Sequence, residues 1–284
     1  MRWSRTGGEN YQRGGRTGGL ALPVTAGGGV IGLLVLLASV LLGGGGGGGS
    51  GLGNVLQSDL GAPGPETEQD KFVAFLADDT QAVWAGIFKS EGRQYRPALV
   101  RSFQGQVSTG CGVASSAVGP FYCPADEKVY LDLGFFDELS SRFGAPGDFA
   151  QAYVVAHEMG HHVQKLLGTS DKVRAREQAA GSEAEANQWS VRLELQADCY
   201  AGVWAHSVYE RGQKQDSDVA LEPGDIEEGL RAAQGVGDDR LQAQAGMRVD
   251  PETWTHGSSE QRQTWFKRGY ENGDPGACNT FAGA

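Results

Sequence analysis

Hydrophobic residues recur at helical spacing in five stretches of the chain. Between residues 66 and 91, large apolar residues stand mostly three or four positions apart or side by side, and Gly92 follows as a stop signal. A second helix is expected to begin at Asp148, a candidate N-cap, and to end at Leu167 before a glycine. The remaining helices are expected over 183–211, after a capping-box sequence, and within 225–245 and 251–270.

Two shorter stretches read as strands. They cover residues 97–103 and 128–133, and in the second Val129, Leu131 and Leu133 alternate with Tyr130 and Asp132. The polar stretch 169–181 between two expected helices is interpreted as a connection. The pattern therefore predicts an α+β domain that is mostly helical and carries a small sheet.

The first 65 residues have a different character from the rest. Residues 1–19 are rich in Gly and Arg and are expected to be disordered. Residues 20–42 carry no charge, and their length fits one membrane-spanning helix. Residues 43–65 form a Gly-rich linker, so the folded domain is expected over 66–284. An uncleaved signal anchor is favoured over a cleaved signal peptide because no clear Ala-x-Ala site follows the apolar run.

Charge is unevenly distributed along the chain, and its sign limits the kinds of molecule that the protein can bind. The formal net charge is −11, which argues against a nucleic-acid partner because phosphate binding needs a basic surface. Residues 1–19 carry a net charge of +3, so the remainder carries −14. Arginines before an apolar segment are expected to stay in the cytoplasm, which would place the acidic domain on the opposite side of the membrane.

The candidate chemistry centres on His157, Glu158 and His161. Residues four apart share one face of a helix, so both imidazoles can reach one metal ion. Glu158 can then act as general base toward a water on that ion, which is the pattern of zinc hydrolases. His162 is expected to point about 100° away from His161 and not to be a ligand. The alternative is an amphipathic helix that carries the same His-Glu-x-x-His sequence but whose histidines merely face solvent or a partner.

A catalytic zinc site needs a third protein ligand. Gln164 and Leu167 stand where a longer three-histidine motif would need Gly and His, which excludes that class. Glu194 and Asp198, four apart on the expected helix 183–211, are better candidates. Glu194 is assigned as ligand and Asp198 as the acceptor that orients His157. The alternatives are exchanged roles, or two surface carboxylates on an acidic protein.

Longer segments around these residues carry a family resemblance. The sequences HEMGHH and ELQADCYAGVWAH resemble the gluzincin class of zinc peptidases, and more closely the bacterial family of predicted neutral zinc metallopeptidases. The likeness continues through VGPFYCPADEKVYLDLGFFDEL and THGSSEQR and covers roughly residues 66–284. It implies a zincin-like fold, one Zn²⁺ ion, a peptide or protein substrate and an N-terminal membrane segment.

Two further expectations concern substrate. Attack on a peptide carbonyl creates an oxyanion that needs a hydrogen-bond donor, and His256 is the best candidate. A His and Arg pair similar to His256 and Arg262 follows the third ligand in prenyl-protein-type membrane gluzincins. His256 could instead cap the following helix, and Arg262 could simply pair with an acidic neighbour. In zincin-like folds substrate adds to an edge strand, a place expected for 128–133 unless that strand is interior.

Four cysteines allow three pairings. The favoured one joins Cys111 to Cys123 and Cys199 to Cys278, because disulfides persist in an exported domain. Four reduced thiols in a cytosolic protein would contradict the membrane anchor.

The leading hypothesis is a zinc endopeptidase anchored by one helix in the bacterial cytoplasmic membrane, with its catalytic domain on the extracytoplasmic side. The alternatives are a non-catalytic membrane-tethered metal-binding scaffold and an amidase acting on cell-wall peptides. The intact Glu158 disfavours the scaffold, since a structural metal needs no base.

Overall fold

The computed structural model describes residues 1–4, 7–15, 64–215 and 217–282. The predicted membrane segment 20–42 and nearly all of the predicted linker 43–65 lie outside the described residues. In the described ranges, no helix combines the length and apolar character needed to cross a membrane. The prediction of an α+β domain that is mostly helical is confirmed, and the prediction of a membrane helix stays a prediction.

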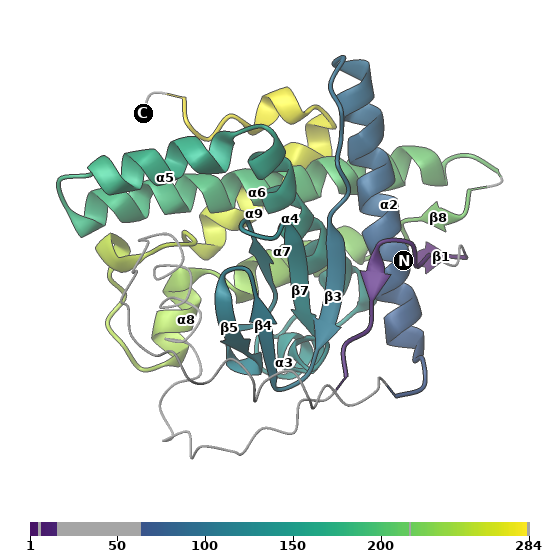
Figure 1. The fold of residues 1–284 in the computed structure, drawn as a ribbon, viewed down its shortest axis with the longest axis horizontal. Coiled ribbons are helices and arrows are strands. Elements are labelled where there is room, and N and C mark those ends of the chain that lie inside the picture. The colour runs from purple at the N-terminus through teal and green to yellow at the C-terminus, as the bar shows by residue number, and fades with distance from the viewer. Residues whose placement is uncertain (5–6, 16–63, 216, 283–284) are drawn as a thin grey trace.

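The helical part is organised around α4 (Asp148–Leu166) and α6 (Glu183–Gly212). Nearly all of α4 is buried, because it packs against α6, α7, α2 and the sheet. The long helix α6 runs across the molecule, and α9 lies along it (Figure 1). The other helices are α2 (Glu68–Ser90), α3 (Phe135–Ser141), α5 (Thr169–Ala179), α7 (Asp225–Gly235), α8 (Asp238–Gln244) and α9 (Ser259–Asn272).

The main sheet has four strands in the order β2-β3-β7-β6. Its members are β2 (Tyr11–Gln12), β3 (Leu99–Phe103), β7 (Lys128–Asp132) and β6 (Phe121–Cys123). The expectation that 128–133 forms the edge is wrong, since β7 pairs with β3 on one side and with β6 on the other. Its side chains are accordingly almost all buried. Among the described residues, β6 is the terminal strand at that side of the sheet.

Two further small sheets lie among the described residues. A hairpin of β4 (Gln106–Thr109) and β5 (Gly112–Ser115) projects from the main sheet, and β1 (Arg2–Trp3) pairs with β8 (Val219–Ala220). Figure 1 shows the hairpin beside β7 and the β1–β8 pair at the far side of α2.

The prediction that residues 1–19 are disordered is wrong for 1–4 and 7–15. There β1 and β2 add to the domain, and β2 runs parallel to β3. The physical reason is the few apolar residues in this stretch: Met1 is buried, and the Trp3 ring packs on Phe72 and Phe75 of α2. The first residues therefore belong to the core of the same domain.

The prediction that 169–181 is a mere connection is also wrong. This segment forms α5, an 11-residue helix with only Val173 and Glu177 buried. Because so few apolar residues are buried, the sequence shows almost no hydrophobic periodicity here. The helix is stabilised by its packing against α6. The α6 helix begins at Glu183 as predicted, and the hydroxyl of its N-cap Ser182 accepts from the Glu185 amide. The predicted capping box is incomplete, because the Glu185 side chain accepts from the Gly181 amide.

The favoured disulfide pairing is confirmed. Cys111 is bonded to Cys123 and Cys199 to Cys278, with Cα–Cα distances of 5.8 and 5.5 Å. The first bond ties the β4–β5 hairpin to β6, and the second ties the C-terminal segment to α6. The second bond begins one residue after Asp198 and anchors this part of α6 to the C-terminal segment.

Glycines allow α6 and α9 to touch backbone to backbone. A Cβ at Gly269 would lie 1.9 Å from the carbonyl oxygen of Cys199, and one at Gly202 would lie 2.1 Å from that of Phe266. Neither oxygen can move without shifting a helix. This close approach is what allows Arg262 on α9 to reach Asp198 on α6.

Replacing Gly269 by Ala is expected to destabilise the protein by about 1–3 kcal/mol, because the two helices must separate. The free energy of unfolding in urea measures this. Gly86→Ala is the matched control: its Cβ would meet nothing within 4 Å, so helix propensity should make the change neutral or stabilising. Equal stabilities for both variants would contradict the packing argument.

Candidate metal centre

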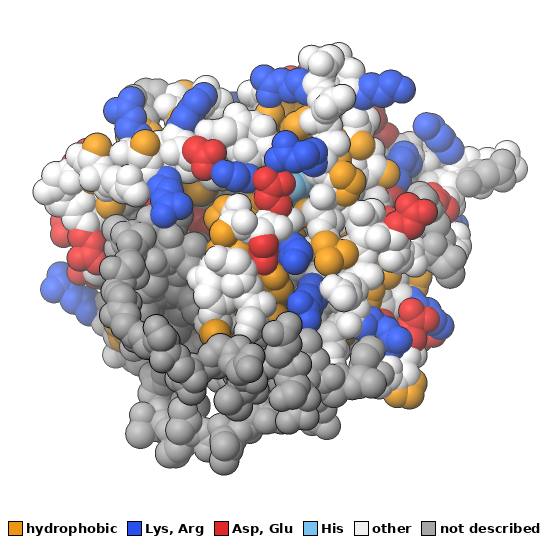
Figure 2. Space-filling view, in the orientation of Figure 1, with side chains coloured by type: hydrophobic (Ala, Val, Ile, Leu, Met, Phe, Trp, Pro, Cys, Tyr) orange, Lys and Arg blue, Asp and Glu red, His pale blue; other side chains and the backbone are white. Residues whose placement is uncertain are grey.

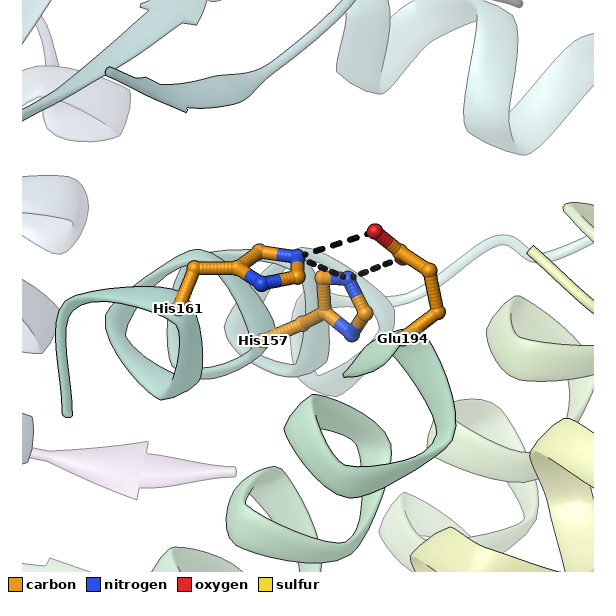
Figure 3. Close-up of side chains that lie close together, drawn as sticks. All are labelled: His157, His161 and Glu194. Carbon is orange, nitrogen blue, oxygen red and sulfur yellow. Dashed lines mark hydrogen bonds and ion pairs between the residues drawn. The ribbon is translucent and has the colours of Figure 1, made fainter. Parts of the chain in front are cut away.

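Three side chains from two crossing helices point at one another. His157 and His161 come from successive turns of α4, and Glu194 reaches them from α6 (Figure 3). The two histidine Nε2 atoms are 3.2 Å apart. The Glu194 carboxylate lies 3.2 Å from Nε2 of His157 and 3.3 Å from Nε2 of His161. The structure thus brings together the three residues that the sequence assigned as ligands.

The distance between the two Nε2 atoms fits a tetrahedral ion, with a Glu194 oxygen as the third ligand atom. Metal–ligand bonds of about 2.0–2.1 Å at tetrahedral angles separate the ligand atoms by roughly 3.3–3.4 Å. Two imidazoles and one carboxylate are also a donor set of catalytic zinc sites, in which a fourth position stays open. The residues present therefore fit one Zn²⁺ ion.

Asp198 holds the far side of His157. Its carboxylate lies 2.8 Å from Nδ1 of His157 and accepts two hydrogen bonds from Arg262, at 2.8 and 2.9 Å. The Tyr153 hydroxyl donates to the same carboxylate. In the neutral imidazole the proton on Nδ1 is held by Asp198, which leaves Nε2 available to a metal. Asp198 therefore lies behind the ligand, and Glu194 lies beside the metal position.

His161 has a corresponding partner that sequence reasoning missed. The side-chain oxygen of Gln164 lies 2.9 Å from Nδ1 of His161. The Gln164 amide nitrogen donates to the Leu193 carbonyl and to Gln196, which fixes the oxygen toward the imidazole. Gln196 donates in turn to the Cys278 carbonyl. The available signal was the position of Gln164 three residues after His161, on the same face of α4.

A glycine between the two histidines sets the distance between α4 and α6. A Cβ on Gly160 would lie 3.1 Å from both the Cα and the carbonyl oxygen of Ala197. The backbones of the two helices therefore approach closely one residue before His161 and one residue before Asp198. This crossing lets the short Glu194 side chain reach both imidazoles.

Glu158 lines a cavity of about 560 Å³ that also contains the three candidate ligands. The side chain is buried, with 7% of its surface exposed. Burial raises the pKa of Glu158, although the neighbouring His157 and His161 act in the opposite direction. A carboxylate with a raised pKa beside an open metal position is suited to accept and return a proton.

His256 and Arg262 also border this cavity, and both are buried. Asp238 accepts from the backbone amide of His256 at 2.7 Å, and its carboxylate lies 3.3 Å from Nδ1. Burial alone would lower the pKa of His256, but the charge of Asp238 outweighs it and raises the pKa. The alternative that His256 caps α9 is not what the structure shows, because Ser258 is the N-cap.

The remaining histidines lie away from the three ligands. His162 points toward the sheet, where its Nε2 donates to the Arg96 carbonyl and its Nδ1 meets the Tyr122 hydroxyl. His206 donates from Nδ1 to the Tyr270 carbonyl. Each therefore connects α4 or α6 to a neighbouring element.

The charges around the candidate ligands are matched to a dication. Among the described residues that line the cavity, the buried Glu158 and Glu194, with Asp198 behind them, are opposed by one guanidinium, that of Arg262. Burial alone would raise the pKa of Asp198, but Arg262 and His157 keep it below its usual value. Two negative charges stay uncompensated when the histidines are neutral. A divalent ion balances them.

Zinc binding is expected to release protons and to tighten as the pH rises. Burial alone would lower the pKa of His157, but Asp198 and Glu194 raise it to about 10 when no metal is bound. Below that pH a proton competes with the metal, so affinity should rise about tenfold per pH unit between pH 6 and 8 for each proton displaced. Calorimetry in two buffers of different ionisation enthalpy measures the release. A pH-independent affinity would show that the site carries no such proton.

The fold and these residues define a class of site: a candidate zinc centre between two helices, one of which carries the His-Glu-x-x-His motif. The comparisons with known proteins agree with it. Residues 1–281 match the family described as "Putative neutral zinc metallopeptidase", and the chain belongs to that family.

Curated relatives are identical to this chain at about half of the aligned positions. The protein YpfJ of Escherichia coli (strain K12) is 52% identical over 216 residues, which cover 76% of this chain and 72% of YpfJ. The protein Rv2575 of Mycobacterium tuberculosis (strain ATCC 25618 / H37Rv) is 48% identical over 229 residues, which cover 79% of this chain and 74% of Rv2575. Both are described as uncharacterized. No solved structure gives a significant match.

Proposed function

We propose that this chain is a zinc-dependent endopeptidase in which His157, His161 and Glu194 hold the metal. The observation that carries the proposal is the convergence of two imidazole nitrogens, 3.2 Å apart, with the two oxygens of Glu194, each within 3.3 Å of one of them, in a cavity that also holds a buried carboxylate outside the ligand set. A structural metal would need no such carboxylate. The metal-binding scaffold is therefore the weaker alternative.

When bound, Zn²⁺ supplies a Lewis acid that polarises a carbonyl and acidifies water. Glu158 takes the proton of the attacking water and passes it to the leaving amine. His256 donates a hydrogen bond to the oxyanion that develops on the carbonyl oxygen. Arg262 acts indirectly, because its guanidinium holds Asp198, and Asp198 holds the His157 ring.

A peptide substrate is favoured by the strand that borders the cavity. Phe121 and Tyr122 of β6 line it, and among the described residues β6 pairs only with β7. A substrate backbone can therefore add to the free side of β6 next to the metal ligands. The same arrangement would accept the peptide part of cell-wall material, so the amidase alternative differs only in the bond that is cleaved.

A nucleic-acid partner remains disfavoured. On the face drawn in Figure 2, Lys and Arg side chains are interspersed with Asp and Glu and form no continuous basic surface. This agrees with the formal net charge of −11.

The extracytoplasmic location and the membrane anchor over 20–42 are also proposals. Two disulfides support the first, because such bonds persist in oxidising compartments. The uncharged stretch of the sequence supports the second.

The test is removal and return of the metal. The full chain is expected to bind one zinc ion, to cleave an unfolded protein such as casein, to lose that activity on dialysis against a chelator, and to regain it with zinc. Cleavage is read by mass spectrometry of the fragments. Zinc binding without any cleavage of casein or of muropeptides would overturn the enzyme proposal. Cleavage of muropeptides alone would favour the amidase.

A further inference from the structure

The cavity extends well beyond the metal ligands, along one face of α6. Its wall includes Glu194, Ser190, Ala186 and Glu183, which are spaced three or four residues apart. At a rise of 1.5 Å per residue this wall is roughly 16 Å long, enough for about five residues of extended peptide. The α5 helix forms the opposite border of this part.

Glu177 projects into this border from α5. It lines the cavity, and only 6% of its surface is exposed. One carboxylate oxygen accepts from the Ser190 hydroxyl at 2.7 Å. The other, Oε2, is buried, and no group among the described residues donates to it.

Holding α5 against α6 does not require this carboxylate. A glutamine would accept from Ser190 equally well, without the cost of burying a charge. Burial raises the pKa of Glu177, and Ser190 and Arg174 only partly offset it. A buried acceptor without a donor, on a residue that lines a binding cavity, indicates a ligand that supplies the missing partner.

The missing donor must come from outside the described wall, and a cation is the donor that best balances a buried carboxylate. Arg262 is the one Lys or Arg among the described residues of the cavity, and both of its edges are engaged by Asp198 and the Val236 carbonyl. We propose that Glu177 is a specificity-determining residue that binds the side chain of a Lys or Arg residue in the substrate, with Ser190 holding the carboxylate in place. This inference rests on the proposed peptidase function.

The position of the subsite follows from α6. Ser190 lies one helical turn, roughly 6 Å, from the candidate ligand Glu194. That distance equals about two residues of extended peptide. The basic residue is therefore expected within about two positions of the cleaved bond.

The experiment compares peptides that differ only in Lys against norleucine, which keeps the four-carbon stem and lacks the charge. For the full, zinc-loaded chain, kcat/KM at one position should favour Lys by about 10- to 100-fold. Glu177→Gln should bring this ratio close to 1 with little change for norleucine peptides. Ser190→Ala should reduce the ratio partially.

Glu183→Gln is the matched control. Glu183 is an exposed carboxylate on the same wall, so its loss should leave the Lys preference intact. Bound zinc and the thermal midpoint show whether each variant is folded. If Glu177→Gln does not fold, the Lys preference of Ser190→Ala tests the subsite instead. A wild-type protein that treats Lys and norleucine alike at every position, or a Glu177→Gln protein that keeps the preference, would overturn the inference.

Binding separates this inference from the peptidase proposal. The same peptides, carrying a fluorescent label, are titrated onto the Glu158→Gln protein and onto Glu158→Gln with Glu177→Gln. Tighter binding of the Lys peptide that depends on Glu177 supports the subsite even if no peptide is cleaved. Cleavage without any dependence on Glu177 supports the peptidase and rejects the subsite.

Discussion

Replacing Glu158 by Gln is expected to lower kcat for peptide hydrolysis by about 10²–10⁴-fold while zinc stays bound. The amide has nearly the shape of the carboxylate but cannot take a proton from water. Zinc should be retained because the ligand atoms belong to His157, His161 and Glu194. Kinetics of a fluorogenic peptide, beside metal analysis of the same sample, measure both quantities.

Stability gives this prediction an internal control. Burial raises the pKa of Glu158, so the fold disfavours the charged form of this side chain. Exchanging it for a neutral amide should leave the thermal midpoint unchanged or raise it. A variant that is inactive because it is unfolded would melt early. A variant that is folded, loaded with zinc and fully active would remove Glu158 from the mechanism.

Replacing Glu194 by Gln is expected to weaken zinc binding by more than about 100-fold. This exceeds the loss of metal affinity that follows when only a hydrogen-bond partner of a ligand is mutated. The change removes the only anionic ligand, and a carboxamide oxygen is a poorer donor for Zn²⁺. Competition with a chelator of known affinity measures the change. Activity at saturating zinc should be partly restored, because Glu158 remains in place.

Asp198→Asn is the comparison that separates the two carboxylates of α6. It should weaken zinc binding by about 10- to 100-fold and also destabilise the fold by about 3–5 kcal/mol, since Arg262 stays buried without its partner. Glu194→Gln should not destabilise the metal-free protein in this way. The reverse pattern, with zinc lost in Asp198→Asn and kept in Glu194→Gln, would exchange their roles.

The candidate site was largely predictable because its residues obey helical spacing. His157 with His161, and Glu194 with Asp198, are both pairs four residues apart, and this spacing alone directs each pair to one side of a helix. The crossing that joins the two pairs was not predictable. It depends on Gly160 of α4 meeting Ala197 of α6, and a sequence does not show which backbones will touch.

Other features were missed because their signal lies outside any local pattern. Gln164 appeared only as a residue that breaks a longer histidine motif, whereas its amide orients His161. The α5 helix buries too little apolar surface to show a period, and Glu177 looked like one of many acidic residues. Strands β1 and β2 are two residues long and exist only through their partners β8 and β3.

The pairing of β2 with β3 has a topological consequence. Strands that share hydrogen bonds lie in one compartment, so residues 11–12 and 99–103 must be on the same side of any membrane while they are paired. A chain that crosses a membrane once between them places them on opposite sides. The predicted single crossing and the β2–β3 ladder therefore belong to different states of the molecule. Insertion of the predicted membrane segment into a bilayer would separate β2 from the sheet and leave β3 as a new open edge.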